Sequence, residues 1–354
     1  MAKREKHIYK RPNGKFEGRY IKGYDENGKA KYGSVYAATY AEVKVRLEQI
    51  NKIEAPVSRH PKTLRDTLNA YLGSVKNTVK PATIGAYEMY ISNYILPYFG
   101  NIKADALTNE AAQGFVNKLI ENGLSARTVR PVFSFMKAAL SRNFDVRLPK
   151  PNKKEADVFT PEEQKRLETA AKLAKSEDYI GVMICLYTGL RIGELCGLMW
   201  QDLDFEQRIL HVRRTLQRIK NNDGDTKTKM ALLPPKSHTS ERTIPLQTFL
   251  IELLQQHKSV NGGIYVISKN NKPTEPRNFS WRFKQILNSA NIRDTGVHTM
   301  RHAFATRALE NGFDVKTLSE ILGHSSPGFT LTQYGHSLDD HKRNSMEALS
   351  AIRE

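Results

Sequence analysis

Short segments in which polar and apolar residues alternate open the chain. They cover residues 7–10, 15–24 and 29–36, and turns that contain Asn-Gly pairs, at 12–14 and 25–28, separate them. Asn-Gly pairs favour the positive φ angles of tight hairpins. Thr39 and Glu42 have the spacing of a capping box, so a helix is expected to begin near Thr39. Residues 1–54 are therefore predicted to form a three-stranded sheet followed by a helix.

The next part of the chain has apolar residues at helical spacing. Helices are expected over 63–72, from Pro81 to Pro97, over 109–121, and from Ser125 to about 140. Their aromatic residues lie in the apolar stripes and are expected to form a core. Ala55-Pro56 and His60-Pro61 mark a linker before this part, and 148–154, with two prolines and three lysines, marks another after it. Residues 60–150 are predicted to be an all-helical domain.

The remaining residues, 155–354, have a mixed pattern that is mostly helical. Thr160-Pro161-Glu162-Glu163 combines a cap, a proline at the first helical position and a capping glutamate. Residues 209–214 alternate as a strand, and two further strands, 231–233 and 242–246, flank a polar turn at 236–240. The fold class predicted for the chain is multidomain and mainly α with small β parts. A small sheet with a helix, an all-helical domain and an α+β domain follow one another.

Composition adds a preference for a polyanionic partner. The 354 residues have a formal net charge of +18, and the excess of Lys and Arg is densest in the first 150 residues. Lysine and arginine side chains on phosphates release counterions, so nucleic acid is the expected partner. No apolar run is long enough to cross a membrane, and the N-terminus lacks the apolar core of a secretory signal. Two cysteines fit a reducing cytosol, and a cytoplasmic location is expected.

The residues best suited to chemistry lie in the last 170 positions. Arg191 follows a glycine at an expected helix start, and Glu194, three residues on, can hold its guanidinium. His298 and Arg301 share one helix face. The other candidates are Lys236, His324 and Tyr334.

This set suits phosphoryl transfer at a phosphodiester. Arginine forks match the non-bridging oxygens, on which charge collects in the transition state. A tyrosine can attack phosphorus and keep the phosphodiester bond energy in a covalent phosphotyrosine, so no ATP is needed. Lys236 could protonate the leaving oxygen, and the arginines could replace a divalent metal.

A metal site is the weaker alternative for the two histidines His298 and His302. They lie four residues apart on one helix face, but Thr299 stands where a metalloprotease helix has Glu, and no third ligand is specified. No metal and no cofactor are expected. Singly, each candidate also has an ordinary role, as a surface ion pair, a core histidine or a core tyrosine.

In combination and in order, these residues resemble the tyrosine recombinase (phage integrase) family. The resemblance is carried by TGLRIGEL at 188–195, HTMRHAFAT at 298–306, LGHSSP at 322–327 and TLTQYGH at 330–336. It covers about 60–354, and the N-terminal unit is similar to the arm-binding domain of integrases from conjugative transposons and Gram-positive phages. The implied domains are an arm-type DNA-binding domain (1–54), a helical, SAM-like core-binding domain (60–150) and a catalytic domain (155–354).

The resemblance also implies a role for each candidate residue. Arg191 and Arg301 would hold the scissile phosphate, and His324 would donate to one of its non-bridging oxygens. Lys236 would be the general acid, although lysines 220, 227 and 229 lie in the same region. His298 would orient the phosphate or assist proton transfer from Tyr334. Tyr334 would be the nucleophile and leave a 3′-phosphotyrosine, and Glu194 would support Arg191.

The expected function is site-specific recombination that integrates and excises a mobile element. The implied partners are double-stranded DNA, at core and arm sites, and three further copies of the chain in a homotetramer on DNA. The resemblance also suggests an excisionase and a host DNA-bending protein as accessory partners. Two other functions stay open: a DNA-binding regulator without chemistry, which would leave the candidate set unexplained, and a type IB topoisomerase, which would not need a separate N-terminal DNA-binding module.

Overall fold

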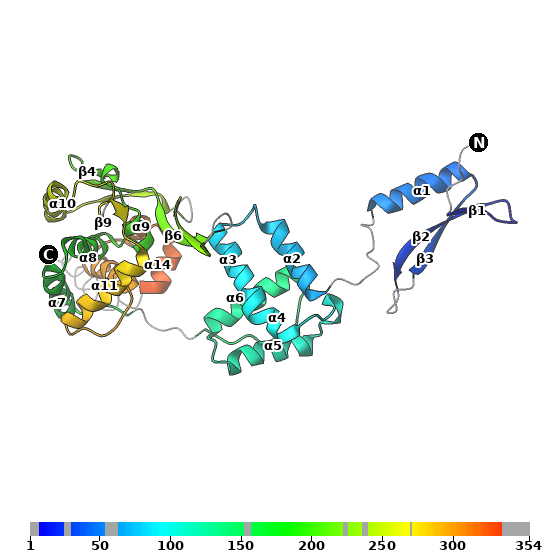
Figure 1. The fold of residues 1–354 in the computed structure, drawn as a ribbon, viewed down its shortest axis with the longest axis horizontal. Coiled ribbons are helices and arrows are strands. Elements are labelled where there is room, and N and C mark those ends of the chain that lie inside the picture. Colours follow the sequence, from blue (N-terminus) through cyan, green and yellow to red (C-terminus); the bar gives the residue numbers. More distant parts are fainter. Residues whose placement is uncertain are drawn as a thin grey trace, which may run out of the picture. The chain divides into compact units, whose positions relative to one another are not determined.

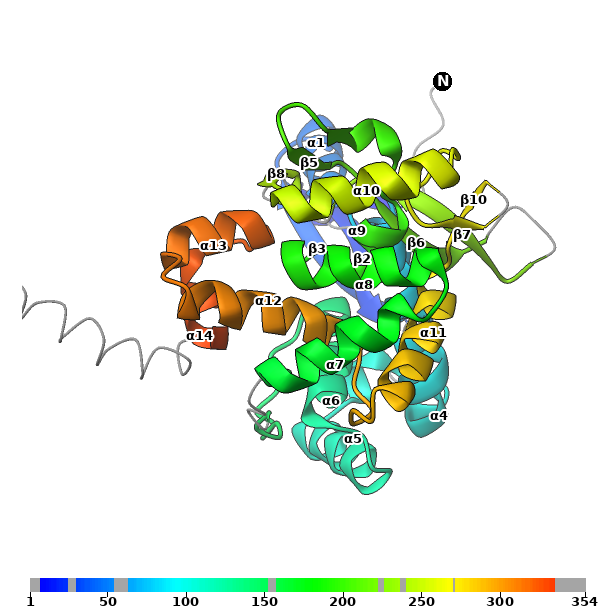
Figure 2. The same ribbon diagram turned by 90° about the vertical axis from the view of Figure 1, so that its left-hand side faces the viewer.

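A computed structural model describes residues 7–24, 30–53, 63–151, 157–221, 226–235, 240–269 and 271–334. The chain divides into two compact units, Met1–Asn152 and Lys153–Glu354. Figures 1 and 2 together label their α-helices and β-strands. The first unit contains two separate hydrophobic clusters, one under the N-terminal sheet and one among the helices that follow.

The N-terminal residues form the predicted sheet and helix. Strands β1 (Ile8–Lys10), β2 (Phe16–Tyr24) and β3 (Ala30–Ala37) pair antiparallel in that order, and α1 (Tyr40–Ile53) follows. The Thr39 hydroxyl accepts from the amide of Glu42, as the capping pattern predicts. α1 packs so closely on β2 that a Cβ at Gly18 would lie 2.5 Å from Val43. Only a residue without a side chain fits there.

Residues 63–151 form the predicted helical domain around one core. Its helices are α2 (Leu64–Val75), α3 (Pro81–Tyr90), α4 (Leu96–Phe99), α5 (Asn109–Glu121) and α6 (Ala126–Leu140), with a π-helical turn η1 (Ile91–Ile95) and a short 3₁₀ turn η2 (Ala104–Ala106). The predicted aromatic core is confirmed. Phe133 and Phe135 are buried, and the Tyr87 ring lies 4.5 Å from that of Phe135 between centroids.

The second unit is built around α8 (Ser176–Thr188), which is buried along most of its length. α8 contacts α7 (Pro161–Lys172), α9 (Ile192–Cys196), α10 (Thr248–Val260), α11 (Pro276–Ser289) and α12 (His298–Glu310). Thr160 and Glu163 form the predicted capping box at the start of α7. Figure 2 shows α12 extending from α8 toward α13 (Val315–Leu322) and α14 (Pro327–Tyr334).

The strands of this unit differ from the prediction in one respect that matters for Lys236. β5 (Ile209–Val212) pairs with β4 (Leu203–Asp204) and β8 (Arg242–Pro245), whereas β6 (Thr215–Lys220) pairs with β7 (Thr228–Leu233). The sequence predicts that the segments on either side of 236–240 pair with each other across that turn. This prediction is wrong, because the two segments belong to two different sheets. Pro234 and Pro235 end β7 because they have no backbone N–H to donate.

Short elements complete the unit, and the predicted fold class is confirmed. A 3₁₀ turn, η3 (Trp200–Asp202), precedes β4, and β9 (Ser268–Lys269) pairs with β10 (Lys272–Pro273) before α11. The described chain is mainly helical with small antiparallel sheets. Within it, no helix combines the length and the apolar character needed to cross a membrane.

Candidate active site

The turn between α8 and α9 places the first arginine. α8 ends at Gly189 with a φ of +66°, and Arg191 then caps α9 in an extended conformation. A Cβ at Gly189 would also lie 2.6 Å from Phe304 and 2.8 Å from Leu322, so both the backbone and the packing require glycine. At this sharp turn 37% of the Arg191 side chain is exposed, whereas Leu190 and Glu194 are buried.

Glu194 holds Arg191 in the way its spacing predicts. The Glu194 carboxylate accepts from the Arg191 side chain at 2.8 Å and from the Arg191 backbone N–H at 3.0 Å. Arg191 also donates to the carbonyl of Gly323 at 3.3 Å. Burial alone would raise the pKa of Glu194, but the charges of Arg242 and Arg191 outweigh it and hold the pKa below its ordinary value.

Arg301 joins two helix ends from inside the core. Only 1% of this residue is exposed, and its guanidinium donates to the carbonyls of Gly189 and Leu322, each at 2.7 Å. Both carbonyls belong to helix C-termini, which carry partial negative charge and attract a cation. Burial, together with Arg191 and Arg242, lowers the pKa of Arg301 to about 9, so the side chain is still charged at neutral pH.

A cavity of about 460 Å³ lies beside these arginines. Its lining contains the predicted residues Arg191, Glu194 and His324, and the remainder consists of Thr215, Gln217, Pro235, Ser240, Gly323, Ser325 and Phe329. Pro235 and Ser240, the described residues on either side of 236–239, both line the cavity. Lys236 itself lies outside the described residues.

The two predicted histidines carry no charge at neutral pH in this DNA-free chain. Burial, then the charges of Arg301 and Arg191, lowers the pKa of His324 to about 3. Its Nδ1 lies 2.7 Å from the Thr330 hydroxyl, which fixes the ring. Partial burial and the neighbouring His302 and Arg301 lower the pKa of His298 to about 4. A neutral imidazole can still donate one hydrogen bond.

Tyr334 is not among the residues that line the cavity. It ends α14, is 1% exposed, and packs in a cluster with Leu309, Leu318 and Leu322. Its hydroxyl lies 2.8 Å from Nδ1 of His302. Burial raises the pKa of Tyr334 to about 12, although the charges of Arg301 and Arg191 oppose that rise. The phenol is therefore protonated, and the nearby nitrogen is that of His302 rather than that of His298.

His302 and Arg242 are the residues that sequence reasoning missed. His302 was considered only as a partner of His298 in a metal site. The two rings lie edge to face at 4.6 Å, and no group of three or more potential metal ligands occurs in the described part of the chain. Arg242 bonds both Glu194 oxygens at 3.2 and 2.9 Å. The sequence feature that could have indicated Arg242 is its position as a charged residue at the start of the predicted strand 242–246.

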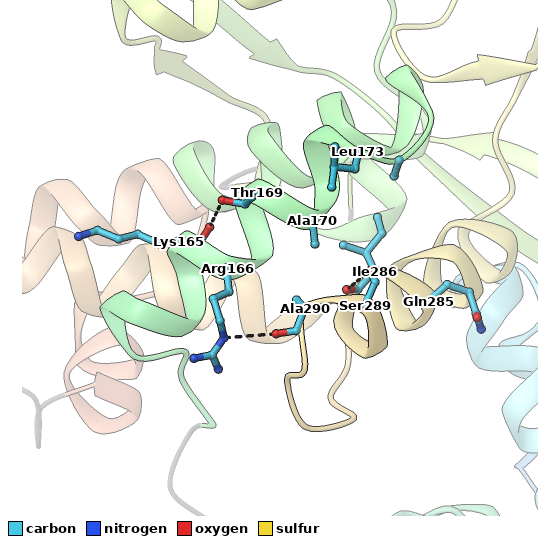
Figure 3. Close-up of a pocket in the computed structure, with 10 residues that line it drawn as sticks. Lys165, Arg166, Thr169, Ala170, Leu173, Gln285, Ile286, Ser289 and Ala290 are labelled. Carbon is cyan, nitrogen blue, oxygen red and sulfur yellow. Dashed lines mark hydrogen bonds between the residues drawn. The ribbon is translucent and has the colours of Figure 1, made fainter.

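A larger cavity, of about 600 Å³, lies between α7 and α11 and is shown in Figure 3. Apolar side chains such as Leu173 and Ile286 dominate it. Its Arg166 is bonded to the Ala290 carbonyl and its Thr169 to the Lys165 carbonyl. It contains none of the predicted catalytic residues, so the smaller, charged cavity is the candidate active site.

The fold and this charged site define a tyrosine-type site-specific recombinase. Residues 157–341 match the phage integrase family, and residues 63–120 match the phage integrase N-terminal SAM-like domain. The chain belongs to the phage integrase family.

Several relatives agree with this assignment. The tyrosine recombinase XerC-like protein of Caldanaerobacter subterraneus subsp. tengcongensis is 30% identical, and the match covers 93% of this chain and 94% of the relative. The Tn1549 transposon integrase, solved in complex with transposon right end DNA, superposes with a TM-score of 0.68 at 25% identity over 80% of this chain and 99% of that chain. A lambda integrase tetramer bound to a Holliday junction shares the fold, with a TM-score of 0.58 at 18% identity over 92% of this chain and 97% of that chain.

Proposed function

We propose that this protein integrates and excises a mobile element by cutting and rejoining DNA through a covalent 3′-phosphotyrosine. The observation that carries the proposal is the convergence of Arg191 and Arg301 on the carbonyls of Leu322 and Gly323, beside the charged cavity and one short helix before Tyr334. The similarity to a transposon integrase that was solved with transposon DNA supports the mobile-element substrate.

In the proposed cleavage step, the Tyr334 oxygen attacks the scissile phosphorus and the bond from phosphorus to the 5′ oxygen breaks. The proton of Tyr334 passes to a neighbouring base, with neutral His298 as the candidate, and Lys236 protonates the 5′ oxygen. Arg191, Arg301 and His324 stabilise the charge on the non-bridging oxygens. Rejoining reverses these bonds with the 5′ hydroxyl of another strand.

Lys236 is the preferred general acid because of the strand register. Thr215 and Gln217 line the cavity and pair with Leu233 and Ala231. The cavity therefore lies where β6 begins and β7 ends. Lys229 pairs with Ile219, two residues beyond Gln217, which is roughly 7 Å further along the strand. Lys236 follows Leu233 by three residues.

Tyr334 has to leave His302 before it can attack. A buried phenol bonded to an imidazole is a resting arrangement, and a short movement of α14 would bring the hydroxyl toward the arginines. Contacts with DNA and a neighbouring protomer would supply the free energy for this movement. Because those contacts exist only in the assembled complex, Tyr334 would not cleave DNA outside it.

We assign the domains and partners in the same proposal. Residues 1–54 bind arm sites on double-stranded DNA, residues 60–150 bind the core site, and residues 155–354 cut it. Four copies assemble on DNA in the cytoplasm, and an excisionase and a host DNA-bending protein assist excision. The net charge of +18 and the likeness to a lambda integrase tetramer bound to a Holliday junction support this arrangement.

A suicide DNA substrate with a nick near the cleavage point tests the function. The wild-type chain should become trapped as a covalent adduct, because the short cut fragment diffuses away and cannot rejoin. Tyr334→Phe should bind the substrate equally well and form no adduct. Tyr179→Phe, on α8, is the matched control and should react like the wild type.

Three outcomes would contradict the proposal. Failure of the wild type to form an adduct would favour a DNA-binding regulator. An adduct with Tyr334→Phe would refute Tyr334 as the nucleophile. Efficient relaxation of supercoiled plasmids that carry no recombination site would favour a topoisomerase.

A further inference from the structure

Arg242 connects three elements around the charged cavity, and no role in the reaction has been given to it so far. It begins β8, and 5% of its side chain is exposed. Its guanidinium donates to both oxygens of Glu194, to the carbonyl of Ser240 at 3.0 Å, and to the carbonyl of Ile321 on α13. A planar fork with five N–H groups can make all of these bonds at once, whereas a lysine cannot.

Glu194 depends on this side chain for its charge. The Glu194 side chain is also 5% exposed, and its two oxygens accept from both Arg191 and Arg242. A buried carboxylate is stable only when it is paired and hydrogen-bonded. If Arg242 is removed, Arg191 is the guanidinium left to neutralise Glu194.

Arg191 has to serve the cavity as well as Glu194. It lines the cavity and is the more exposed of the two arginines, with 37% of its side chain accessible. With Arg242 in place, Glu194 needs only part of the Arg191 guanidinium, and the N–H groups that bond neither Glu194 nor Gly323 can reach a ligand. Without Arg242, Glu194 loses the larger of the two charges that keep it ionised, and a protonated carboxyl group no longer fixes the Arg191 guanidinium at the cavity.

We propose that Arg242 is a positioning residue which, by sharing Glu194, holds the Arg191 guanidinium in the cavity where it contacts the scissile phosphodiester. The inference rests on the proposed function, because it concerns the same cleavage step. It adds to that function a residue outside the predicted catalytic set that acts only through its neighbours.

The first test measures adduct formation by Arg242→Lys and Arg242→Gln in a single turnover on the nicked substrate. At saturating DNA, both variants should react about 10- to 100-fold more slowly than the wild type, the range typical of a residue that orients a functional group. Their affinity for the substrate should change far less, because most binding free energy comes from other phosphate contacts.

Arg242 could act through Glu194 on Arg191, or through Ser240 on the segment that carries Lys236. A substrate with sulfur in place of the bridging 5′ oxygen distinguishes these two possibilities. A thiolate leaves without a proton, so this substrate should rescue Lys236→Ala. It should not rescue Arg242→Gln, whose defect lies in holding the phosphate. Rescue of Arg242→Gln by sulfur would overturn the proposal, because Arg242 would then act on the segment that carries Lys236, through Ser240.

The pH profile gives a signature that a general loss of stability would not produce. In Arg242→Gln, the pKa of Glu194 should rise because one of the two cations that lower it is gone. The ratio of the variant's rate to that of the wild type should therefore fall as the pH is lowered from 8 to 6, since protonated Glu194 cannot hold Arg191. A ratio that does not change with pH would count against the proposal.

Arg282→Lys is the matched control. Arg282 forms a partly buried ion pair with Asp178 and lies outside the cavity lining, so this variant should lose some stability and keep the wild-type cleavage rate. The double variant Glu194→Gln/Arg242→Gln removes both buried charges and guards against misfolding of the single variants. Its cleavage should stay slow because Arg191 has lost its carboxylate.

Equal cleavage by Arg242→Lys and Arg282→Lys, or wild-type cleavage by the double variant, would overturn the inference. A wild-type chain that forms no adduct with either substrate would instead overturn the proposed function itself. The two failures are therefore distinguishable.

Discussion

His298 and His324 show how burial among arginines prepares a residue for an anion. With pKa values of about 4 and 3 in the chain without DNA, both rings are neutral at neutral pH. A phosphodiester in the cavity would add a negative charge beside them and raise both pKa values. A group whose pKa rises on binding takes up a proton, so affinity increases as the pH falls through the interval between the free and bound pKa.

We therefore predict that core-site DNA binds more tightly at pH 5 than at pH 7, because the interval of proton uptake begins at the free pKa values of about 4 and 3. The slope can reach about tenfold per pH unit for each histidine that titrates. Fluorescence anisotropy at constant ionic strength measures it, with the wild type compared with His298→Gln/His324→Gln. His211→Gln, on β5, is the matched control and should keep the wild-type slope. Equal slopes in the wild type and the double variant would show that these histidines do not take up protons.

At the scale of elements, the N-terminal sheet presents one face to solvent. α1 covers the face that contains Phe16, Gly18 and Tyr20, and strand alternation places Glu17 and Arg19 on the other. Exposed tyrosines share that open face, because Tyr9 and Tyr36 both pair with Glu17 across the strands.

A buried carboxylate organises this open face. Glu17 is 1% exposed and accepts from Arg11, from Arg19 at 3.2 Å and from the Ser34 hydroxyl at 2.8 Å. The Ser34 hydroxyl contributes most to lowering the pKa of Glu17 to about 2, and Arg19 and Arg11 add to it against the effect of burial. The carboxylate stays ionised and fixes two arginines that can face DNA.

We predict that Glu17→Gln reduces the preference for arm-site DNA over non-specific DNA by about tenfold, the value of a well-placed arginine contact with a base. Non-specific affinity should not fall, because the variant is more positive by one charge. Competition binding with the two DNAs measures the preference. Glu48→Gln, exposed on α1, makes the same charge change and should keep the preference. An unchanged preference in Glu17→Gln would show that the Glu17 carboxylate does not orient Arg11 and Arg19 for DNA.

At the scale of the whole molecule, the proposed roles are separable because the chain is built from parts with their own cores. The sheet with α1, the helical domain and the second unit each enclose a separate hydrophobic cluster. The proposed catalytic side chains all belong to the second unit.

We predict that a chain lacking residues 1–54 binds and cleaves core-site DNA like the full chain but no longer integrates at a full site with arms. Gel-shift and suicide-substrate assays measure the first two activities, and a plasmid integration assay measures the third. Full integration by the truncated chain would refute the arm-binding role of these residues.

Local patterns predicted most elements because they depend on neighbouring residues. Neighbouring residues form the Thr39 hydroxyl cap, the capping box at Thr160, the proline start of α3 and the alternation in 15–24, each within one turn of helix or one strand pair. That β7 pairs with β6 and β8 with β5 could not be predicted in this way. Which strands pair depends on distant segments, and Ile244 is buried opposite Leu210 rather than beside β7.

The sequence by itself determined the order of the elements, the positive net charge that favours DNA as a partner, and the residue types able to cut a phosphodiester. Spacing and side-chain chemistry are local properties, so no tertiary structure is needed to find them. Only the tertiary structure decided that Arg242 shares Glu194 with Arg191, that Arg301 joins two helix ends, and that Tyr334 rests against His302. These contacts join residues up to 112 positions apart, and burial in a common core, which no local pattern encodes, fixes both their geometry and their charge.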